Sequence, residues 1–180
     1  MKITIIRHAK VDFTGQAWCT AKEFNRGNED YDVADIIRDK KYHIKTSNPV
    51  YISGLIRTKE TARLIFGNEK FHKTALCNEV PICAFTNKNL NLPTRIWEIV
   101  ARILWIFNSK RQPETYRQTK KRANDLINHL ELEKKDCYIV SHGVFMRVFR
   151  IEMKKRGYCL GREKNHASGI ENLERFVYIK

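Results

Sequence analysis

Residues 2–9 read KITIIRHA, and this stretch decides the predicted fold. Residues 2–6 are β-branched and mostly apolar without a helical period, which predicts a buried strand of the kind found in parallel sheets. Arg7 and His8 follow directly at the carboxyl end of that strand. In open α/β sheets, ligands bind just beyond the carboxyl ends of the strands. Arg7 and His8 are therefore candidates for binding or catalysis.

The rest of the chain continues the alternation of strands and helices. Further strands are predicted at 46–53, 76–80, 137–141 and 176–179, and helices at 32–39, 55–66, 94–107, from Pro113 onward and at 143–156. Residues 11–30 are expected to form a loop with at most a short helix. This order predicts an α/β fold, a three-layer α/β/α sandwich with a mostly parallel central sheet. The length of 180 residues suits a single domain over 1–180, with a small helical excursion at about 84–112.

The composition points to an anionic partner inside a reducing compartment. The chain has 34 Lys and Arg against 20 Asp and Glu, a net charge of +14, which favours phosphate esters, nucleic acid or an acidic membrane surface. No nucleic-acid-binding motif and no run of about 20 apolar residues occurs, so we expect neither a nucleic-acid nor a membrane partner. Five cysteines without a C-x-x-C pair suit a cytoplasmic protein better than a secreted one.

Polar residues follow the other predicted strands as well. Ser53 and Arg57 come after the second strand, Glu79 ends the third, and His142 and Gly143 follow the fourth. Together with the first strand, this places two imidazoles, two guanidiniums and one carboxylic acid at one sheet edge. Guanidiniums bind phosphate oxygens, a neutral imidazole can attack phosphorus, and helix N-termini add N–H donors to an anion. We expect Ser53 and the backbone of Gly143 to contact the phosphate, and no metal or cofactor because no H-E-x-x-H spacing occurs.

These residues lie in four motifs: IIRHA at 5–9, SGLIRTKETA at 53–62, NEVPI at 78–82 and IVSHG at 139–143. Their order and spread over the chain resemble the histidine phosphatase superfamily, the phosphoglycerate mutase-like proteins. The resemblance implies the phosphoglycerate mutase-like fold and a covalent phosphohistidine intermediate.

The resemblance also implies a role for each residue. His8 matches the nucleophile, and Arg7 and Arg57 match the arginines that bind the phosphoryl group. His142 matches the second histidine, which hydrogen-bonds the phosphate and stabilises charge. Glu79 matches the acid that protonates the leaving oxygen and then activates water.

One departure from the family pattern concerns the residue after the nucleophile, which is Ala9 in place of the usual glycine. Lys10 to Asp12 also differ from the mutases. The resulting prediction is a metal-independent phosphatase that hydrolyses phosphate monoesters of a small molecule. The alternatives are a phosphoglycerate-type mutase, a phosphatase of phosphohistidine on proteins, and an inactive phosphate-binding module.

Two features leave alternatives open. Residues 96–107, IWEIVARILWIF, are apolar nearly all round. Burial between the sheet and the excursion is the favoured interpretation, ahead of a homodimer contact and of membrane-surface association. Arg122 borders the apolar face of its predicted helix, where it either packs as a surface arginine or reaches the pocket.

Overall fold

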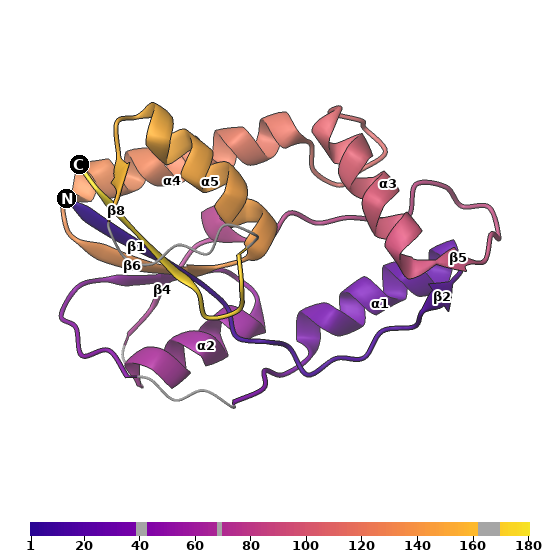
Figure 1. Ribbon diagram of the computed structural model, residues 1–180, viewed down its shortest axis with the longest axis horizontal. Helices are drawn as coiled ribbons and strands as arrows, with labels where there is room; N and C mark the ends of the chain where they lie inside the picture. Colours follow the sequence, from indigo (N-terminus) through magenta and orange to yellow (C-terminus); the bar gives the residue numbers. More distant parts are fainter. Residues whose placement is uncertain (39–42, 68–69, 162–169) are drawn as a thin grey trace.

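The computed structural model describes residues 1–38, 43–67, 70–161 and 170–180 (Figure 1). The strands are β1 (Lys2–Arg7), β2 (Trp18–Cys19), β3 (Val50–Ile52), β4 (His72–Lys73), β5 (Leu92–Pro93), β6 (Cys137–Ser141), β7 (Cys159–Leu160) and β8 (Arg175–Ile179). The helices are α1 (Ala21–Val33), α2 (Ile56–Phe66), α3 (Thr94–Ile106), α4 (Tyr116–Glu133), α5 (Gly143–Lys155) and the short 3-10 helix η1 (Ala75–Cys77).

A six-stranded sheet in the order β4-β3-β6-β1-β8-β7 forms the centre of the molecule. Strands β4, β3, β6 and β1 are parallel to one another, whereas β8 runs antiparallel to both of its neighbours, β1 and β7. The prediction of a mostly parallel sheet is confirmed. In the register of β1 and β6, Arg7 pairs with Ser141, so the residues that follow these two strands leave the sheet side by side.

Helices cover both faces of this sheet, as expected for three layers (Figure 1). Ile3 and Ile5 of β1 pack into a cluster with the apolar residues of α4 and α5, and each is fully buried. Ile6 points to the opposite face and packs with Ile65 and Phe66 of α2. Alternate residues of one strand thus serve two different cores, because side chains alternate across a sheet. This double burial explains why residues 2–6 are almost continuously apolar.

The C-terminal segment closes one side of β1. Strand β8 pairs antiparallel with β1 along its length. At the carboxyl end of β1, the backbone N–H of Arg7 donates to the Glu174 carbonyl at 3.0 Å, and the N–H of Leu173 donates to the Arg7 carbonyl at 3.1 Å. The backbone that precedes the predicted nucleophile is therefore fixed on both sides, by β6 and by residues 173–174.

A third, smaller core lies away from the sheet, between α1 and α3 (Figure 1). Trp97 of α3 is fully buried there, with its ring 4.5 Å from that of Phe85 and 6.0 Å from that of Phe24. Its indole Nε1 donates to the Cys19 carbonyl at 2.9 Å. Residues 84–112, predicted as a helical excursion, contain β5 and α3, and β5 pairs with β2. This core holds α1 and α3 together beside the sheet.

The prediction for residues 11–39 is wrong in its placement of the helix. Helix α1 spans Ala21–Val33, so most of it lies in the segment 11–30 that was expected to be a loop, and residues 34–38 are not helical. Thr20 caps the helix by accepting from the Glu23 N–H, and the Glu23 side chain returns to the Thr20 N–H, which is a capping box. The chain then extends, and Ile36 forms a bridge with Val11. Residue 39 of the predicted helix lies outside the described residues.

Two further element predictions need correction. Residues 76–80 form no strand: η1 occupies Ala75–Cys77, and the edge strand β4 ends earlier, at Lys73. Thr74 favours the tight turn because its hydroxyl accepts from the Leu76 N–H. Helix α4 begins at Tyr116 and not at Pro113, because Thr115 and Gln118 build a second capping box there.

Helix α3 is not buried on all sides, so the favoured interpretation of residues 96–107 is wrong. Its buried residues are Trp97, Ala101 and Trp105, which recur every four positions on one face. The opposite face is exposed and includes Ile99 at 54% and Phe107 at 78% of their full accessible surface. One face contributes Trp97 to the third core and Trp105 to the main core, and the other face meets the solvent.

Candidate active site

The carboxyl ends of β1 and β6 bring His8 and His142 together. The centres of their rings are 5.1 Å apart, with the ring planes inclined at 56°. His8 is 2% exposed and His142 is fully buried. The parallel register explains this proximity, since Arg7 and Ser141 are paired and each histidine is the next residue. Two residues that are 134 positions apart in the chain thus share one site.

The imidazole of His8 is oriented by one of its nitrogens, and the other has no hydrogen-bond partner among the described residues. Its Nδ1 lies 2.6 Å from the Ala9 carbonyl oxygen, and because a carbonyl only accepts, Nδ1 carries the proton. The Nε2 atom of the neutral ring therefore keeps its lone pair. Burial lowers the pKa of His8 to about 3, and the positive charges of Arg57 and Arg7 act in the same direction. At neutral pH the ring is uncharged and can act as a nucleophile.

The loop around His8 is fixed by side chains from two other segments. The Ala9 N–H donates to the Thr61 hydroxyl of α2 at 2.9 Å, and Asn172 donates through Nδ2 to the His8 carbonyl at 2.8 Å. Ala9 itself is fully buried. Both bonds are made by the peptide between His8 and Ala9, so they fix the backbone from which the His8 side chain extends.

Arg57 lies in the first turn of α2 and is almost completely buried, with a side chain that is 2% exposed. Its Nη1 donates to Asp32 Oδ1 at 2.8 Å, and its Nε donates to His142 Nδ1 at 3.2 Å. The guanidinium also lies over the Tyr31 ring, 4.9 Å from its centre. Asp32 and Tyr31 belong to the end of α1. Arg57 thus links the helix that sequence reasoning placed wrongly to the two histidines.

His142 and Ser53 form a chain of hydrogen bonds behind Arg57. Because His142 Nδ1 accepts from Arg57, the proton of the neutral ring is on Nε2, which donates to Ser53 Oγ at 2.8 Å. Ser53 Oγ lies 2.8 Å from Thr58 Oγ1, whose hydroxyl donates to the Leu55 carbonyl at 2.8 Å. Burial holds the pKa of His142 well below its usual range, with Arg57 acting in the same direction.

These bonds change the expectations for two residues. Both ring nitrogens of His142 already have protein partners, although the resemblance implied a direct bond to phosphate. Ser53, expected to contact the phosphate, is 1% exposed and serves as a partner of His142. Sequence reasoning gave no sign of this arrangement, because hydroxyl partners of a buried histidine have no spacing rule.

Arg7 and Gly143 are close-packed on the other side of His8. A Cβ atom added to Gly143 would lie 3.3 Å from both Nε and Cζ of Arg7, which is tighter than ordinary contact. Arg7 donates through Nη1 to the Ile170 carbonyl. Its Nε is buried and has no hydrogen-bond partner among the described residues. A buried donor without a partner is costly, so this atom is suited to an anion that enters the site.

Glu79 reaches the site from the segment after η1 and is held at the N-terminus of α5. Its carboxylate accepts from the N–H groups of Phe145 at 3.0 Å, Val144 at 3.4 Å and Val80 at 2.9 Å. The first N–H groups of a helix have no partner within the helix, so these bonds fix the Glu79 side chain in one position. The absence of a strand at 76–80 does not remove Glu79 from the site.

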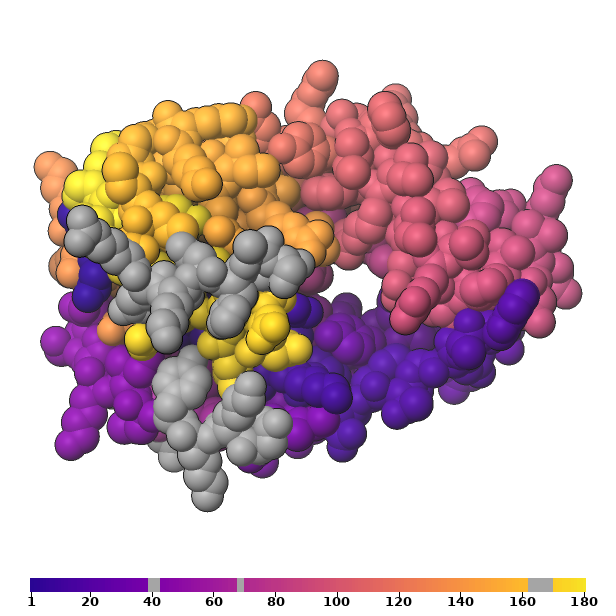
Figure 2. Space-filling model, viewed as in Figure 1, coloured from indigo at the N-terminus to yellow at the C-terminus, as the bar shows by residue number. Residues whose placement is uncertain are grey.

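A large cleft adjoins Arg57 and Glu79. Its volume is about 1250 Å³, and its lining comes from α1, α3, the start of α4 and the segment around Glu79. Figure 2 shows it as a hollow between the sheet and the part built by α1 and α3. Six acidic residues and four arginines line it, so the positive excess of the chain lies outside the cleft. Among the described residues, no group of three His, Cys, Asp or Glu is placed to hold a metal ion.

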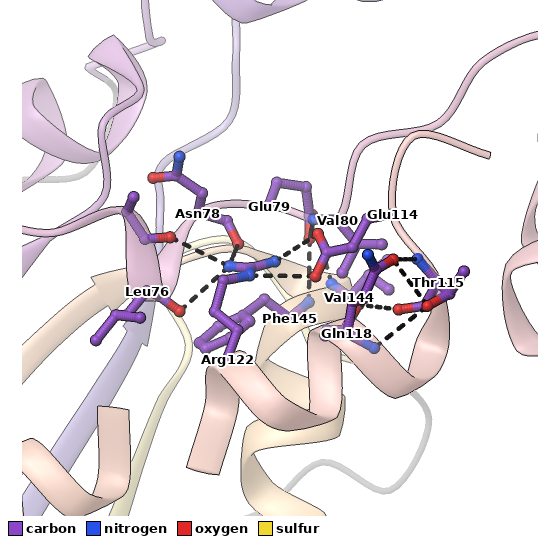
Figure 3. A network of polar contacts seen from close by, with 12 residues as sticks. Leu76, Asn78, Glu79, Val80, Glu114, Thr115, Gln118, Arg122, Val144 and Phe145 are labelled. Atoms are coloured by element: carbon purple, nitrogen blue, oxygen red, sulfur yellow. Dashed lines mark hydrogen bonds and ion pairs between the residues drawn. The ribbon is translucent and has the colours of Figure 1, made fainter. Parts of the chain in front are cut away.

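Arg122 also lines this cleft, so the interpretation that it reaches the pocket is correct. Its guanidinium forms a two-point ion pair with Glu114 and donates to backbone carbonyls just before Glu79 (Figure 3).

Within the described part of the chain, no helix is both long and apolar enough to cross a membrane.

Comparisons with known proteins identify the family and the fold. Residues 3–163 match the family described as the histidine phosphatase superfamily (branch 1). No curated protein sequence matches the chain. The solved structures that share the fold include a phosphoserine phosphatase mutant from Entamoeba histolytica in complex with phosphoserine, with 16% identity, a TM-score of 0.56, and coverage of 99% of this chain and 90% of that chain.

Two further structures are similar at comparable distance. A mycobacterial glucosyl-3-phosphoglycerate phosphatase has 13% identity and a TM-score of 0.55, with coverage of 98% of this chain and 88% of its own. A putative alpha-ribazole-5'-P phosphatase from Escherichia coli has 15% identity and a TM-score of 0.51, with coverage of 85% and 79%. At these identities the likeness concerns the fold, and the family match over residues 3–163 carries the assignment. The chain belongs to branch 1 of the histidine phosphatase superfamily.

Proposed function

We propose that the chain is a metal-independent phosphatase that hydrolyses phosphate monoesters of a small molecule through a phosphohistidine on His8. The observation that carries the proposal is the neutral, buried imidazole of His8, whose Nδ1 donates to the Ala9 carbonyl and whose Nε2 has no partner in the described part of the chain. Arg57 and the unpartnered Nε of Arg7 flank it with positive charge. Guanidiniums bind phosphate oxygens in a fork geometry, which places the phosphorus next to the nucleophile.

The proposed reaction has two steps. His8 Nε2 attacks the phosphorus, the ester P–O bond breaks, and the leaving oxygen takes the proton of the Glu79 carboxylic acid. Water then attacks the phosphorus of the phosphohistidine, Glu79 accepts a proton from that water, and the P–N bond breaks. Inorganic phosphate leaves, and both residues return to their starting forms.

His142 and Ser53 act behind the phosphoryl group in this proposal. His142 accepts a hydrogen bond from Arg57 Nε, so it orients the Arg57 guanidinium that faces the phosphate. Ser53 fixes the tautomer of His142 by accepting from its Nε2.

The five cysteines are free thiols, which supports a reducing cytoplasmic location. The names of the structural neighbours support phosphate ester hydrolysis without naming a substrate for this chain.

The test is phosphoryl labelling combined with a substrate panel. The wild-type chain and His8→Ala are incubated with p-nitrophenyl phosphate and with small-molecule phosphate esters, in the presence and absence of a chelator. We expect hydrolysis by the wild type that the chelator does not reduce, an acid-labile phosphoryl label on His8, and loss of both in His8→Ala. Activity that survives in His8→Ala would refute the mechanism. Transfer of the phosphoryl group back to the product instead of water would favour the mutase.

A further inference from the structure

All three nitrogens of the Arg122 guanidinium donate to protein groups. Its Nε and Nη2 donate to the two carboxylate oxygens of Glu114, at 3.2 and 2.9 Å, in a side-by-side pair. Both side chains are largely buried, at 16% and 15% exposure. The remaining nitrogen, Nη1, donates to backbone carbonyls. Because a guanidinium has five N–H donors and no acceptor, little of its capacity remains for a substrate.

The carbonyls that accept from Arg122 Nη1 belong to the segment that carries Glu79. They are the carbonyls of Asn78 at 2.7 Å, Leu76 at 3.2 Å and Ala75 at 3.4 Å (Figure 3). This segment is not part of the sheet, so no ladder of hydrogen bonds fixes it. Side chains hold it instead, and the shortest contact from Arg122 is to the residue directly before Glu79.

Arg122 also touches the helix that holds the carboxylate of Glu79. Its guanidinium carbon lies 4.8 Å from the centre of the Phe145 ring, and the N–H of Phe145 donates to Glu79. One cation therefore contacts both the backbone from which Glu79 extends and the residue that receives its carboxylate. A displacement of about 1 Å in a reacting group can cost on the order of 100-fold in rate, so this contact has consequences for proton transfer.

We propose that Arg122, held by Glu114, is a positioning residue that fixes Glu79 for proton transfer to the leaving oxygen. The inference rests on the proposed function, in which Glu79 is the acid. Arg122 itself acts through backbone carbonyls and has no role as a phosphate ligand.

Two substrates whose leaving groups differ in their need for a proton distinguish this positioning role from a general loss of activity. The nitrophenolate of p-nitrophenyl phosphate leaves without protonation, whereas the alkoxide of an alkyl phosphate needs an acid. The measured quantity is kcat/KM, which covers the steps up to phosphohistidine formation. For an alkyl phosphate that the wild type hydrolyses, Arg122→Met should lower kcat/KM about 10- to 100-fold, within the range of general acid catalysis. For p-nitrophenyl phosphate the loss should stay below about 3-fold.

Two further variants distinguish a loss of positioning from a folding defect in Arg122→Met. Glu114→Gln keeps the shape of the pair and removes its charge, so we expect a loss in the same direction of about 3- to 10-fold on the alkyl phosphate. Lys121→Met is the matched control, because Lys121 lies on the same helix and forms an exposed ion pair with Asp125 at 2.8 Å. It should leave both substrates unchanged.

A double-mutant cycle with Glu79→Gln decides the mechanism. If Arg122 acts through Glu79, Arg122→Met should add less than about 2-fold to the loss already caused by Glu79→Gln. Additive losses, or equal losses on both substrates, would overturn the positioning role. An active wild type in which Glu79→Gln slows the alkyl ester and Arg122→Met does not would overturn this inference alone. A wild type that hydrolyses neither ester would overturn the proposed function itself.

Discussion

Acid destabilisation through His8 is the prediction that follows most directly from the site. The perturbation is a decrease of pH from 7 to 5. In the unfolded chain His8 titrates near 6.5, whereas burial lowers its pKa to about 3 in the folded protein. Between these values the unfolded state binds a proton that the native state does not, so stability decreases as the pH falls through this window.

The magnitude follows from the pKa difference. One pKa unit corresponds to about 1.4 kcal/mol, so from pH 6.5 to pH 5 His8 alone removes about 2 kcal/mol from the free energy of unfolding. The pKa of His142 is also held below its usual range, so it adds to the loss in the same direction. Well above pH 6.5 both groups are neutral in the folded and in the unfolded chain, so their contribution becomes constant there.

The assay is urea unfolding of the wild type and His8→Gln at pH 7 and pH 5. Replacement by glutamine removes the titrating group, so the decrease between the two pH values should be about 2 kcal/mol smaller in His8→Gln. His72→Gln is the control, because His72 is an exposed histidine on the edge strand β4. A pH dependence in His8→Gln equal to that of the wild type would refute the assignment of His8 as a buried neutral imidazole.

The remaining predictions concern the surroundings of the site. Gly143→Ala should raise KM for phosphate esters about 3- to 10-fold, measured by steady-state kinetics, because its Cβ would displace Arg7. Asp32→Ala should lower the free energy of unfolding by about 1–2 kcal/mol in urea, since buried Arg57 loses a partner that is itself half exposed. Trp97→Ala should cost about 3–5 kcal/mol, because its indole fills the third core. An unchanged unfolding midpoint in either variant, or an unchanged KM in Gly143→Ala, would contradict the corresponding contact.

The central part of the site was predictable because one rule governs it. Buried β-branched runs identify β1 and β6, and parallel strands bring their carboxyl ends to one edge. Once these two strands are neighbours, His8 and His142 must lie close together, as their 5.1 Å ring separation shows. The helix of residues 56–66 was equally readable, since its apolar spacing ends at Gly67.

The surroundings of Arg57 were not predicted, because they depend on a helix in a polar segment. Helix α1 buries only Ala21 and Phe24, so it has little apolar periodicity. The capping box of Thr20 and Glu23 was the available signal. Without that helix, Asp32 had no reason to be placed against Arg57, and their ion pair depends on tertiary contact alone.

The errors at 76–80 and at 96–107 share one physical cause. Apolar residues show that a side chain is buried or faces another apolar surface, but not which backbone conformation carries it. Cys77 and Val80 are buried in the main core from a segment that forms no sheet ladder. Ile99 and Phe107 are as apolar as Trp97 but face the solvent.

The position of β8 has a consequence for synthesis on the ribosome. Strand β1 is translated long before its neighbour β8 and the Asn172 amide that bonds the His8 carbonyl. Until then one edge of β1 has no partner, and an open strand edge invites pairing with other chains. Residues 172–179 must therefore be synthesised before β1 and the loop of His8 have these partners, and we expect chains that lack them to expose this strand edge.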